Sequence, residues 1–228
     1  LSDWLSWGIS PEKASIFIQS GIPQHTELFV ILSTMVPLGW LYRCPSFKDQ
    51  IKQLEAKEIN TYAFLGYPVL QAADILLYKA DCVPAGEDQL PHLELTREIT
   101  RRFNSLTNSQ ILKEPQSLLT EFPRLLGLDG RKMRKSYDNC IYLSEDQEVL
   151  KKKVLNMFTD PQRIKKTQPG RPEVCNVFSY YQGFFSDKTE EIKDSCQNAK
   201  IGCIDCKRML SGLLENFIQE KRDIKKEI

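Results

Sequence analysis

The 228-residue sequence has almost no excess charge of either sign, since 31 lysines and arginines stand against 30 aspartates and glutamates. This balance excludes a uniformly basic nucleic-acid binder. No run of about 18 apolar residues and no signal-peptide pattern occurs, so nothing indicates a membrane span or secretion. No segment is low in complexity, which excludes a disordered chain. These absences predict a globular cytoplasmic protein of one large or two modest domains.

The apolar patterns predict strands and helices in the first part of the chain and helices alone in the second. Residues 15–20 are typical of a buried strand, and residues 81–84 form a second candidate strand. Helical patterns run over residues 24–42, where Pro37 implies a kink or a break, and over residues 68–79, with a proline in the first turn. This order predicts an α/β domain followed by an α-helical one.

Four polar side chains share one face of an otherwise aliphatic helical segment. Tyr67, Gln71, Asp74 and Tyr78 are spaced four, three and four residues apart. Such a helix is expected to be buried on all sides, where a carboxylate is costly unless a group donates to it. Asp74 therefore faces either an internal hydrogen-bond network or a ligand pocket, and its polar neighbours favour the pocket.

The segment after the second candidate strand leads into a helix expected to end near Phe103. Gly86 lets the backbone approach a ligand closely, and the amide groups at a helix start attract anions. Glu87 and Asp88 could equally cap the helix. This segment alone leaves both interpretations open.

Basic side chains concentrate in the middle of the chain. Residues 131–171 hold eleven basic against five acidic side chains, which indicates a local site for a polyanion. Lys132 and Lys135 follow a tight turn at residues 128–130 and can converge on one polyphosphate as pyrophosphate leaves. A basic loop taken alone is more often solvated surface. The helical segment with the polar face and the Gly86 segment favour the phosphate site here.

The seven cysteines fall into two groups. Three are scattered and typical of free thiols. The other four have twenty, six and two residues between them, and in a cytosolic protein this crowding indicates a metal site more than a disulfide framework. The predicted ligands are Cys175, Cys196, Cys203 and Cys206.

These segments together resemble the bacterial-type tryptophanyl-tRNA synthetases, a family of class I aminoacyl-tRNA synthetases. Residues 67–74, 83–89 and 92–97 look like the central block of that family, and residues 132–136 look like its KMSKS loop. The resemblance covers nearly the whole chain. It implies a Rossmann-type parallel sheet followed by an α-helical anticodon-recognition domain. The expected domains are a partial catalytic domain over residues 1–137 and a helical domain over residues 138–228.

The resemblance also implies a reaction, in which L-tryptophan and ATP form the adenylate before transfer to tRNA(Trp). Asp74 would accept the indole N–H, and it would reject phenylalanine because the carboxylate would then be unpaired. Tyr67 and Gln89 would hold the α-amino group, and Gln71 would line the same pocket. Homodimerisation is implied as well, and no membrane partner.

ATP would be bound by two segments. The backbone at Gly86 and Asp88 would face the ribose, and Leu125 would pack on the adenine. Lys132 and Lys135 would act in catalysis by stabilising charge on the pyrophosphate, assisted by Mg²⁺. The full set of expected ATP contacts is Gly86, Glu87, Asp88, Leu125, Lys132, Met133, Arg134, Lys135 and Ser136.

The chain departs from the family pattern in several places. Arg134 replaces the serine of the loop, and Leu126 and Asp138 stand where the family has proline and glycine. The family's first strand and its HIGH-type motif, which contacts ATP, are absent from the sequence. We therefore expect an N-terminally truncated chain that is inactive alone.

The four clustered cysteines match a subset of the family that carries a [4Fe–4S] cluster in the helical domain. Four thiolates could equally bind zinc. Zinc sites favour two short Cys-x-x-Cys hooks, and the single hook here favours iron–sulfur.

Two other functions remain open. Tyrosyl-tRNA synthetases share the fold and the helical Tyr, Gln and Asp spacing, although Ala72-Ala73 and residues 86–89 favour tryptophan. A non-catalytic tRNA-binding paralogue would keep the cysteine cluster and would explain the altered loop. Pyrophosphate exchange driven by tyrosine would indicate the first, and tRNA binding without adenylate formation the second.

Overall fold

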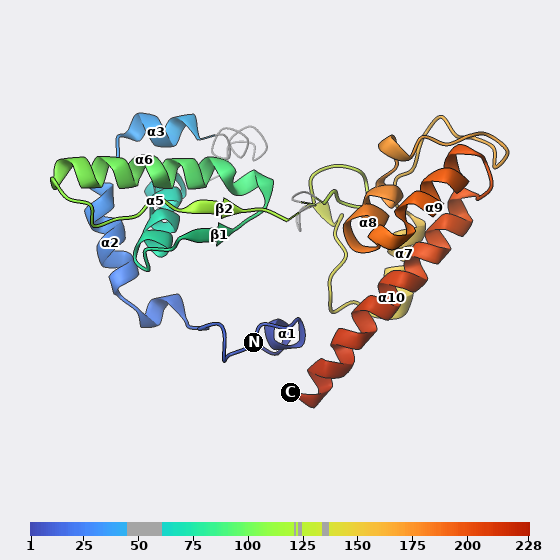
Figure 1. The fold of residues 1–228 in the computed structure, drawn as a ribbon, viewed down its shortest axis with the longest axis horizontal. Coiled ribbons are helices and arrows are strands. Elements are labelled where there is room, and N and C mark those ends of the chain that lie inside the picture. Colours follow the sequence, from blue (N-terminus) through green and yellow to red (C-terminus); the bar gives the residue numbers. More distant parts are fainter. Residues whose placement is uncertain (45–60, 121, 123–124, 134–136) are drawn as a thin grey trace. The chain divides into compact units, whose positions relative to one another are not determined.

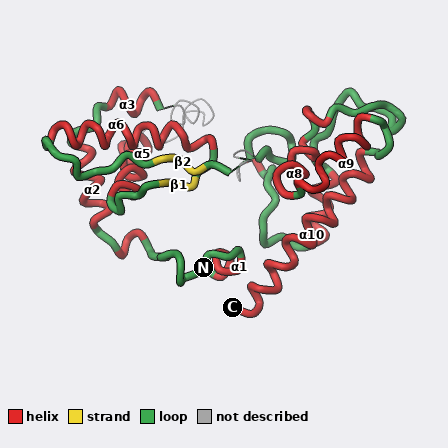
Figure 2. The backbone as a smooth tube through the Cα atoms, in the orientation of Figure 1, coloured by secondary structure: helices red, strands yellow, loops and turns green. Residues whose placement is uncertain are grey.

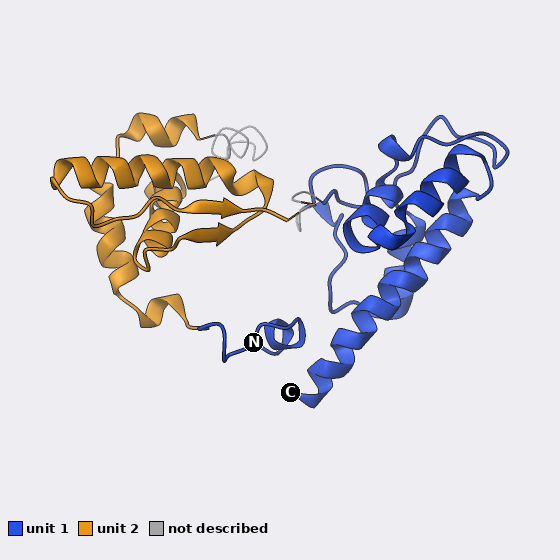
Figure 3. Ribbon diagram, viewed as in Figure 1, with its two compact units in different colours: residues 1–16, 125–228 blue, residues 17–124 orange. Residues whose placement is uncertain are grey.

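The computed structural model describes residues 1–44, 61–120, 122, 125–133 and 137–228. The chain forms two compact units, coloured in Figure 3. Unit 1 comprises residues 1–16 and 125–228, and unit 2 comprises residues 17–124. Within the described ranges, no helix is both long and apolar enough to cross a membrane.

Unit 2 combines a short parallel sheet with helices (Figures 1 and 2). Strands β1 and β2 pair in parallel, with Cys82 opposite Gln116 and Pro84 opposite Leu118. Parallel pairing between strands joined through helix α6 confirms the predicted α/β class for this unit. Its elements are η1 (Gln19–Gly21), α2 (Gln24–Ser33), α3 (Leu38–Arg43), α5 (Tyr62–Leu76), β1 (Cys82–Pro84), η2 (Glu87–Gln89), α6 (Leu90–Leu106) and β2 (Gln116–Leu118).

Helix α5 is the central helix of unit 2 and carries the polar stripe. It begins at Tyr62, because the Thr61 hydroxyl accepts a hydrogen bond from the Phe64 amide at 3.2 Å and caps the helix. The predicted start near Pro68 is therefore wrong, and Pro68 lies inside the helix. The expected burial on all sides is also wrong, since Tyr62 in its first turn is 66% exposed. The helix ends at Leu76 rather than near Lys79, so Tyr78 of the stripe lies just past its end.

The apolar face of α5 forms the core of unit 2 with α2 and α6. Helix α2 ends at Ser33 and α3 begins at Leu38, which confirms the break predicted at Pro37. The fully buried side chains of this core include Leu32, Val69, Ala72, Ala73, Leu76 and Ile99.

Residues 15–20 do not form the predicted buried strand. Ile18 is 78% exposed and Phe17 is 47% exposed. In the part of the chain that the structure describes, β1 pairs with β2 and no strand lies beside this segment. The segment enters the 3₁₀ turn Gln19–Gly21 instead, so its β-branched residues have no sheet to join.

Unit 1 is built from helices, as predicted for the second part of the chain. Helix α7 is capped by Asp146, whose carboxylate accepts from the Val149 amide at 3.0 Å. The core includes Leu150, Tyr180, Tyr181, Leu210 and Leu214. The helices are α1 (Ser2–Ser6), α7 (Gln147–Leu155), η4 (Pro172–Val174), α8 (Asn176–Phe184), α9 (Ser186–Gln197) and α10 (Cys203–Glu227).

Candidate functional site

The Asp74 carboxylate lies at the centre of a hydrogen-bond network on the polar face of α5. The Gln19 side-chain amide donates to both carboxylate oxygens, at 2.7 and 2.9 Å. His25 Nδ1 lies 2.6 Å from Asp74 Oδ1, and His25 Nε2 lies 2.8 Å from the Tyr78 hydroxyl. Side chains from distant parts of the sequence are thus joined through one carboxylate.

This network orients Asp74 without consuming all of its acceptor capacity. A carboxylate offers about four lone-pair positions. Gln19 and His25 occupy two on Oδ1, and Gln19 occupies one on Oδ2. The Asp74 side chain is 36% exposed while that of His25 is 4% exposed. The carboxylate is therefore hydrogen-bonded on the side that faces the buried His25 and is accessible to solvent elsewhere. Among the residues that the structure describes, Gln19 and His25 are the partners of this carboxylate, which leaves a position on Oδ2 for an N–H donor.

Gln19 and His25 are site residues that the sequence pattern did not identify. Gln19 falls within the segment predicted as a strand, and His25 lies 49 positions before Asp74. One signal was available, because the chain has only two histidines. Each of them bonds to a residue of the polar stripe on α5.

The second histidine, His92, lies on α6 beside the other end of the stripe. Its Nε2 is 3.2 Å from the Tyr67 hydroxyl, and its Nδ1 is 3.6 Å from the Cys44 sulfur. The Tyr67 and His92 rings pack edge to face, with centroids 5.4 Å apart. His92 and Cys44 are 3% and 6% exposed, so this group is buried.

The predicted ATP-binding segment lies at the start of α6. Gly86 is in extended conformation, with φ of −74°, so its backbone does not require a glycine. Glu87 and Asp88 occupy the single turn η2 and are exposed. The Gln89 side chain donates to Asp88 at 3.0 Å. Gln71, the residue predicted to line the tryptophan pocket, is half-buried on α5.

The basic turn belongs to unit 1, whereas the polar stripe belongs to unit 2. Residues 128–130 form the predicted tight turn, with Gly130 at φ of +77°, and Leu126 pairs with Lys132 across it. Lys132 is exposed, whereas Leu125 and Met133 pack against the core of unit 1. Arg134, Lys135 and Ser136 lie outside the described residues.

The base of this turn is fixed by polar contacts. The Asp129 carboxylate accepts from the Asn139 amide at 2.8 Å and from the Arg131 backbone at 3.0 Å. The hydrogen bond from Asn139, followed by those from Arg131, lowers the pKa of Asp129 to about 2. Asn139 also donates to the Lys132 carbonyl at 3.1 Å. Asn139 therefore fixes the backbone at Lys132 relative to Asp129.

The four clustered cysteines come together from three helix ends. Burial, with the neighbouring thiols of Cys175, Cys196 and Cys203, raises the pKa of Cys206 to about 12. A guanidinium nitrogen of Arg163 lies 3.6 Å from the Cys196 sulfur and 4.0 Å from the Cys203 sulfur. All four are free thiols.

The predicted metal site is not formed as a set of ligands around one ion. Within the residues that the structure describes, no group of three or more His, Cys, Asp or Glu side chains is arranged to hold a metal ion. A tetrahedral zinc site needs four sulfurs about 2.3 Å from one point. The cysteines are neighbours, but they do not have that arrangement.

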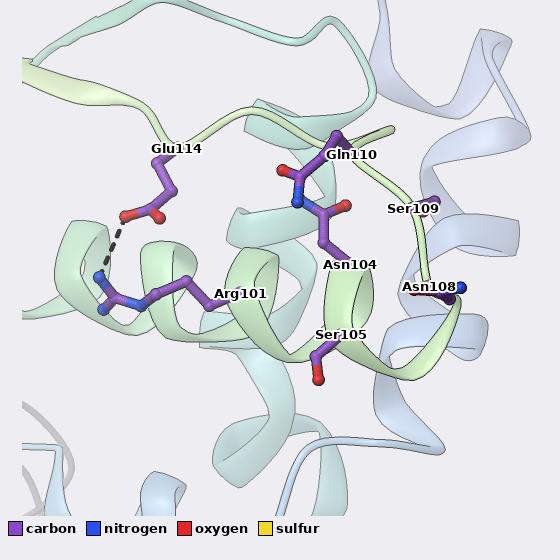
Figure 4. A pocket seen from close by; sticks show the side chains of 7 residues that line it. All are labelled: Arg101, Asn104, Ser105, Asn108, Ser109, Gln110 and Glu114. Carbon is purple, nitrogen blue, oxygen red and sulfur yellow. Dashed lines mark hydrogen bonds and ion pairs between the residues drawn. The ribbon is translucent and has the colours of Figure 1, made fainter.

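A polar pocket of about 720 Å³ lies at the end of α6 (Figure 4). Its Arg101 is paired with Glu114 at 3.1 Å. None of the predicted site residues lines it, and both charged residues are exposed and neutralise each other. The lining residues are Arg101, Asn104, Ser105, Asn108, Ser109, Gln110 and Glu114.

Comparison with known proteins shows which family the sequence matches. Residues 1–219 match the model of the class I tRNA synthetases (W and Y). The chain is 47% identical to the tryptophan–tRNA ligase of Thermotoga maritima over 91% of the chain and 63% of the relative. It is 38% identical to the tryptophan–tRNA ligase of Aquifex aeolicus over 99% of the chain and 75% of the relative.

The fold is similar to that of a solved structure as well. The structure is that of the tryptophanyl-tRNA synthetase of Campylobacter jejuni complexed with ADP and tryptophan. The TM-score is 0.76 at 32% sequence identity, and the match covers 99% of this chain and 70% of that one. The chain thus spans roughly two thirds to three quarters of the length of these relatives.

Proposed function

The chain belongs to the family of class I tRNA synthetases for tryptophan and tyrosine, and on that premise we propose that it activates L-tryptophan with ATP for transfer to tRNA(Trp). The relatives quoted above are tryptophan–tRNA ligases, which favours tryptophan over tyrosine. The observation that carries the proposal is the oriented Asp74 carboxylate with one acceptor position open on Oδ2.

The chemistry of Asp74 explains how one carboxylate selects an amino acid. The indole N–H of tryptophan donates one hydrogen bond, which the open position on Asp74 can accept. Phenylalanine has no such donor, so its binding would desolvate the remaining acceptor position on Oδ2 without giving it a partner, at a cost of about 1–3 kcal/mol. Gln71 would line this pocket, and Tyr67 and Gln89 would bind the α-ammonium group.

The proposal assigns ATP and Mg²⁺ to residues outside the polar stripe, in the segment before α6 and in the basic turn. Gly86, Glu87 and Asp88 would contact the nucleotide, and Leu125 would pack on the adenine. Lys132 and Lys135 would stabilise the charge on the departing pyrophosphate, together with Mg²⁺. The fixed base of the turn supports this assignment, since preorganised charge costs no reorganisation during the reaction.

The test is the amino-acid dependence of binding and activation. Calorimetry with tryptophan, tyrosine and phenylalanine should rank tryptophan first. Pyrophosphate exchange into ATP, measured on a chain that also carries the family's first strand and HIGH-type motif, should give the same order. Asp74→Asn should weaken tryptophan binding about tenfold or more, because an amide presents a weaker acceptor. Asp81→Asn is the matched control on an exposed aspartate of the same unit, and it should change nothing. A preference for tyrosine would contradict the proposal.

We also propose that the four-cysteine group holds a [4Fe–4S] cluster. A cluster separates its ligands further than a single ion does, which suits thiols that are neighbours without surrounding one point. The Arg163 guanidinium beside two of the sulfurs complements an anionic group, and its buried Nε has no hydrogen-bond partner among the described residues. Broad absorbance near ~400 nm with bound iron would support the cluster, and stoichiometric zinc in a colourless protein would contradict it.

Dimerisation and a cytoplasmic location complete the proposal. Large apolar side chains on α2 and α3 are exposed, including Val30 at 56%, Leu38 at 55% and Tyr42 at 51%. Exposed apolar groups of this kind mark association surfaces. All seven cysteines are free, which suits a reducing compartment. Light scattering should give twice the chain mass, and a monomer at micromolar concentration would contradict the dimer.

A further inference from the structure

Tyr78 is the member of the polar stripe to which the proposed reaction gives no role. It lies just past the end of α5, about one helical turn after Asp74, and it is half-exposed. Its hydroxyl is 2.8 Å from His25 Nε2, and the other ring nitrogen of His25 is 2.6 Å from Asp74 Oδ1. The buried imidazole of His25 is therefore held at both nitrogens, between two residues of the stripe.

The two contacts of His25 do not depend on the charge of its ring. An ionised carboxylate has no proton to give, so His25 Nδ1 donates to Asp74 whether the ring is neutral or charged. A phenol hydroxyl both donates and accepts, so Tyr78 can bond to Nε2 in either case. Phe17 lies beside both rings, with its centroid 5.9 Å from that of His25 and 5.6 Å from that of Tyr78. Hydrogen bonds and ring contacts thus fix the position of the imidazole together.

His25 makes the two oxygens of Asp74 unequal. The Gln19 amide donates to both of them at nearly the same distance, 2.7 and 2.9 Å, so Gln19 alone would not distinguish one oxygen from the other. His25 adds a second donor to Oδ1 only. Among the partners that the structure describes, Oδ1 receives two hydrogen bonds and Oδ2 receives one. The acceptor position for a ligand therefore lies on Oδ2.

We propose that His25 and Tyr78 are positioning residues for tryptophan recognition. His25 fixes which oxygen of Asp74 accepts the indole N–H, and Tyr78 holds the His25 ring in the orientation that does so. A half-turn of the imidazole about its bond to Cβ would replace both nitrogens by carbons and lose both hydrogen bonds, so the Tyr78 hydroxyl opposes that rotation. This inference rests on the proposed function, because it deepens the role of Asp74 in that site.

The hydrogen bond from the indole is measured with a pair of ligands. 3-(Benzothiophen-3-yl)-L-alanine has nearly the shape of tryptophan but carries sulfur in place of the indole N–H. The ratio of its dissociation constant to that of tryptophan therefore reports this hydrogen bond. Calorimetry on the unsubstituted chain should give a ratio of about tenfold or more, the size of a hydrogen bond to a charged group. The proton resonance of the indole N–H in bound, ¹⁵N-labelled tryptophan is a second measure, because hydrogen bonding moves it downfield.

Two substitutions of His25 separate its two contacts. The side-chain nitrogen of asparagine lies close to the position of histidine Nδ1, and that of glutamine lies close to the position of Nε2. We expect His25→Gln to lower the ratio to within about threefold of unity and to move the indole N–H resonance upfield, because the donor to Oδ1 is lost. His25→Asn keeps that donor and should retain most of the ratio.

Tyr78→Phe tests the outer contact and removes only a hydroxyl from a half-exposed residue, so the fold should tolerate it. We expect the ratio to fall about two- to threefold when His25 is present. In the His25→Asn variant it should fall no further, since the shorter asparagine does not reach the Tyr78 hydroxyl. Tyr62→Phe, on an exposed tyrosine in the first turn of α5, is the matched control and should leave the ratio unchanged.

The outcomes separate this inference from the function on which it rests. An unchanged ratio in either His25→Gln or Tyr78→Phe, even with both ligands bound more weakly, would show a merely structural role and overturn the inference alone. Equal losses in His25→Asn and His25→Gln would do the same, because the donor to Asp74 would then be irrelevant. An unsubstituted chain that binds neither ligand, or binds both equally, would instead overturn the proposed tryptophan site itself.

Discussion

Among single residues, the polar side chains of the proposed tryptophan site are oriented by partners that lie far away in the sequence. Asp74 is the clearest case, because its orientation depends on Gln19 and His25, 55 and 49 positions away. The helical spacing of the stripe identified Asp74 as a special carboxylate and left a network and a pocket as alternatives. The structure supplies the network, and the open lone pair on Oδ2 keeps the pocket compatible with it.

A second carboxylate, Asp160, makes the pH dependence of stability testable. Its two oxygens accept from the Arg171 guanidinium at 2.7 and 3.0 Å, and its side chain is 6% exposed. The Arg171 hydrogen bonds lower the pKa of Asp160 from 3.8 to about 2. Since the folded-state pKa lies below the unfolded value, this stabilisation is complete above about pH 4 and is lost as the pH falls towards 2.

We expect Asp160→Asn to lower the free energy of unfolding by about 1–2 kcal/mol at pH 7, the lower value reflecting solvent screening at the half-exposed Arg171. The difference from the unsubstituted chain should shrink between pH 4 and pH 2, as urea titrations across that range would show. Asp187→Asn is the control, since that side chain is 74% exposed. A difference that persists unchanged at pH 2 would contradict this explanation.

At the scale of elements, local signals placed most helices but not their exact starts. The break at Pro37 and the turn at residues 128–130 could be predicted because the backbone preferences of proline, aspartate and glycine hold whatever the tertiary contacts are. The start of α5 was misplaced because Pro68 suggested a first turn, whereas the Thr61 cap, seven residues earlier, sets it. Residues 15–20 were misplaced because a strand requires a partner, and β-propensity does not show whether one is present.

The turn that carries Lys132 gives a prediction at this scale. A Cβ on Gly127 would lie 2.2 Å from the Asn139 side-chain nitrogen and 2.9 Å from the Asn139 carbonyl oxygen. Because the second contact is with backbone, no rotamer change can relieve it. We expect Gly127→Ala to destabilise unit 1 by about 1–3 kcal/mol and to slow pyrophosphate exchange more than it weakens tryptophan binding.

The matched control for Gly127 is Gly212, which lies inside α10, where a Cβ would have no other group within 4 Å. Gly212→Ala should stabilise the chain by up to about 1 kcal/mol, because alanine has the higher helix propensity. Thermal unfolding measures the stability of both variants, and pyrophosphate exchange measures their activity. Equal behaviour of the two alanine variants would mean that the base of the turn tolerates displacement.

At the scale of the whole molecule, each unit has its own hydrophobic core. Leu150, Tyr181 and Leu210 belong to the core of unit 1, and Leu32, Val69 and Ile99 to that of unit 2. The sequence predicted an α/β part and a helical part from the order of elements. It could not show that residues 1–16 belong with the C-terminal helices, because that depends on contacts such as Trp7 with Phe217, whose rings are 5.4 Å apart.

Two cores allow ligands to stabilise one unit selectively. The proposed tryptophan site draws on unit 2, and the four-cysteine group lies in unit 1. Binding to the folded form at a hundred times the dissociation constant contributes about 2.7 kcal/mol. Calorimetry should therefore resolve two transitions, of which tryptophan raises only that of unit 2 and removal of bound iron by a chelator lowers only that of unit 1.

The transitions are assigned with one variant in each unit. Asp160→Asn should lower the transition that responds to the chelator. Asp74→Asn should reduce the stabilisation by tryptophan in the other to about half or less, since binding about tenfold weaker leaves about 1.4 of the 2.7 kcal/mol. Tyrosine at the same multiple of tryptophan's dissociation constant serves as the ligand control and should shift neither. One cooperative transition that tryptophan and chelation move together would contradict the assignment, because it would mean that the two cores unfold as one.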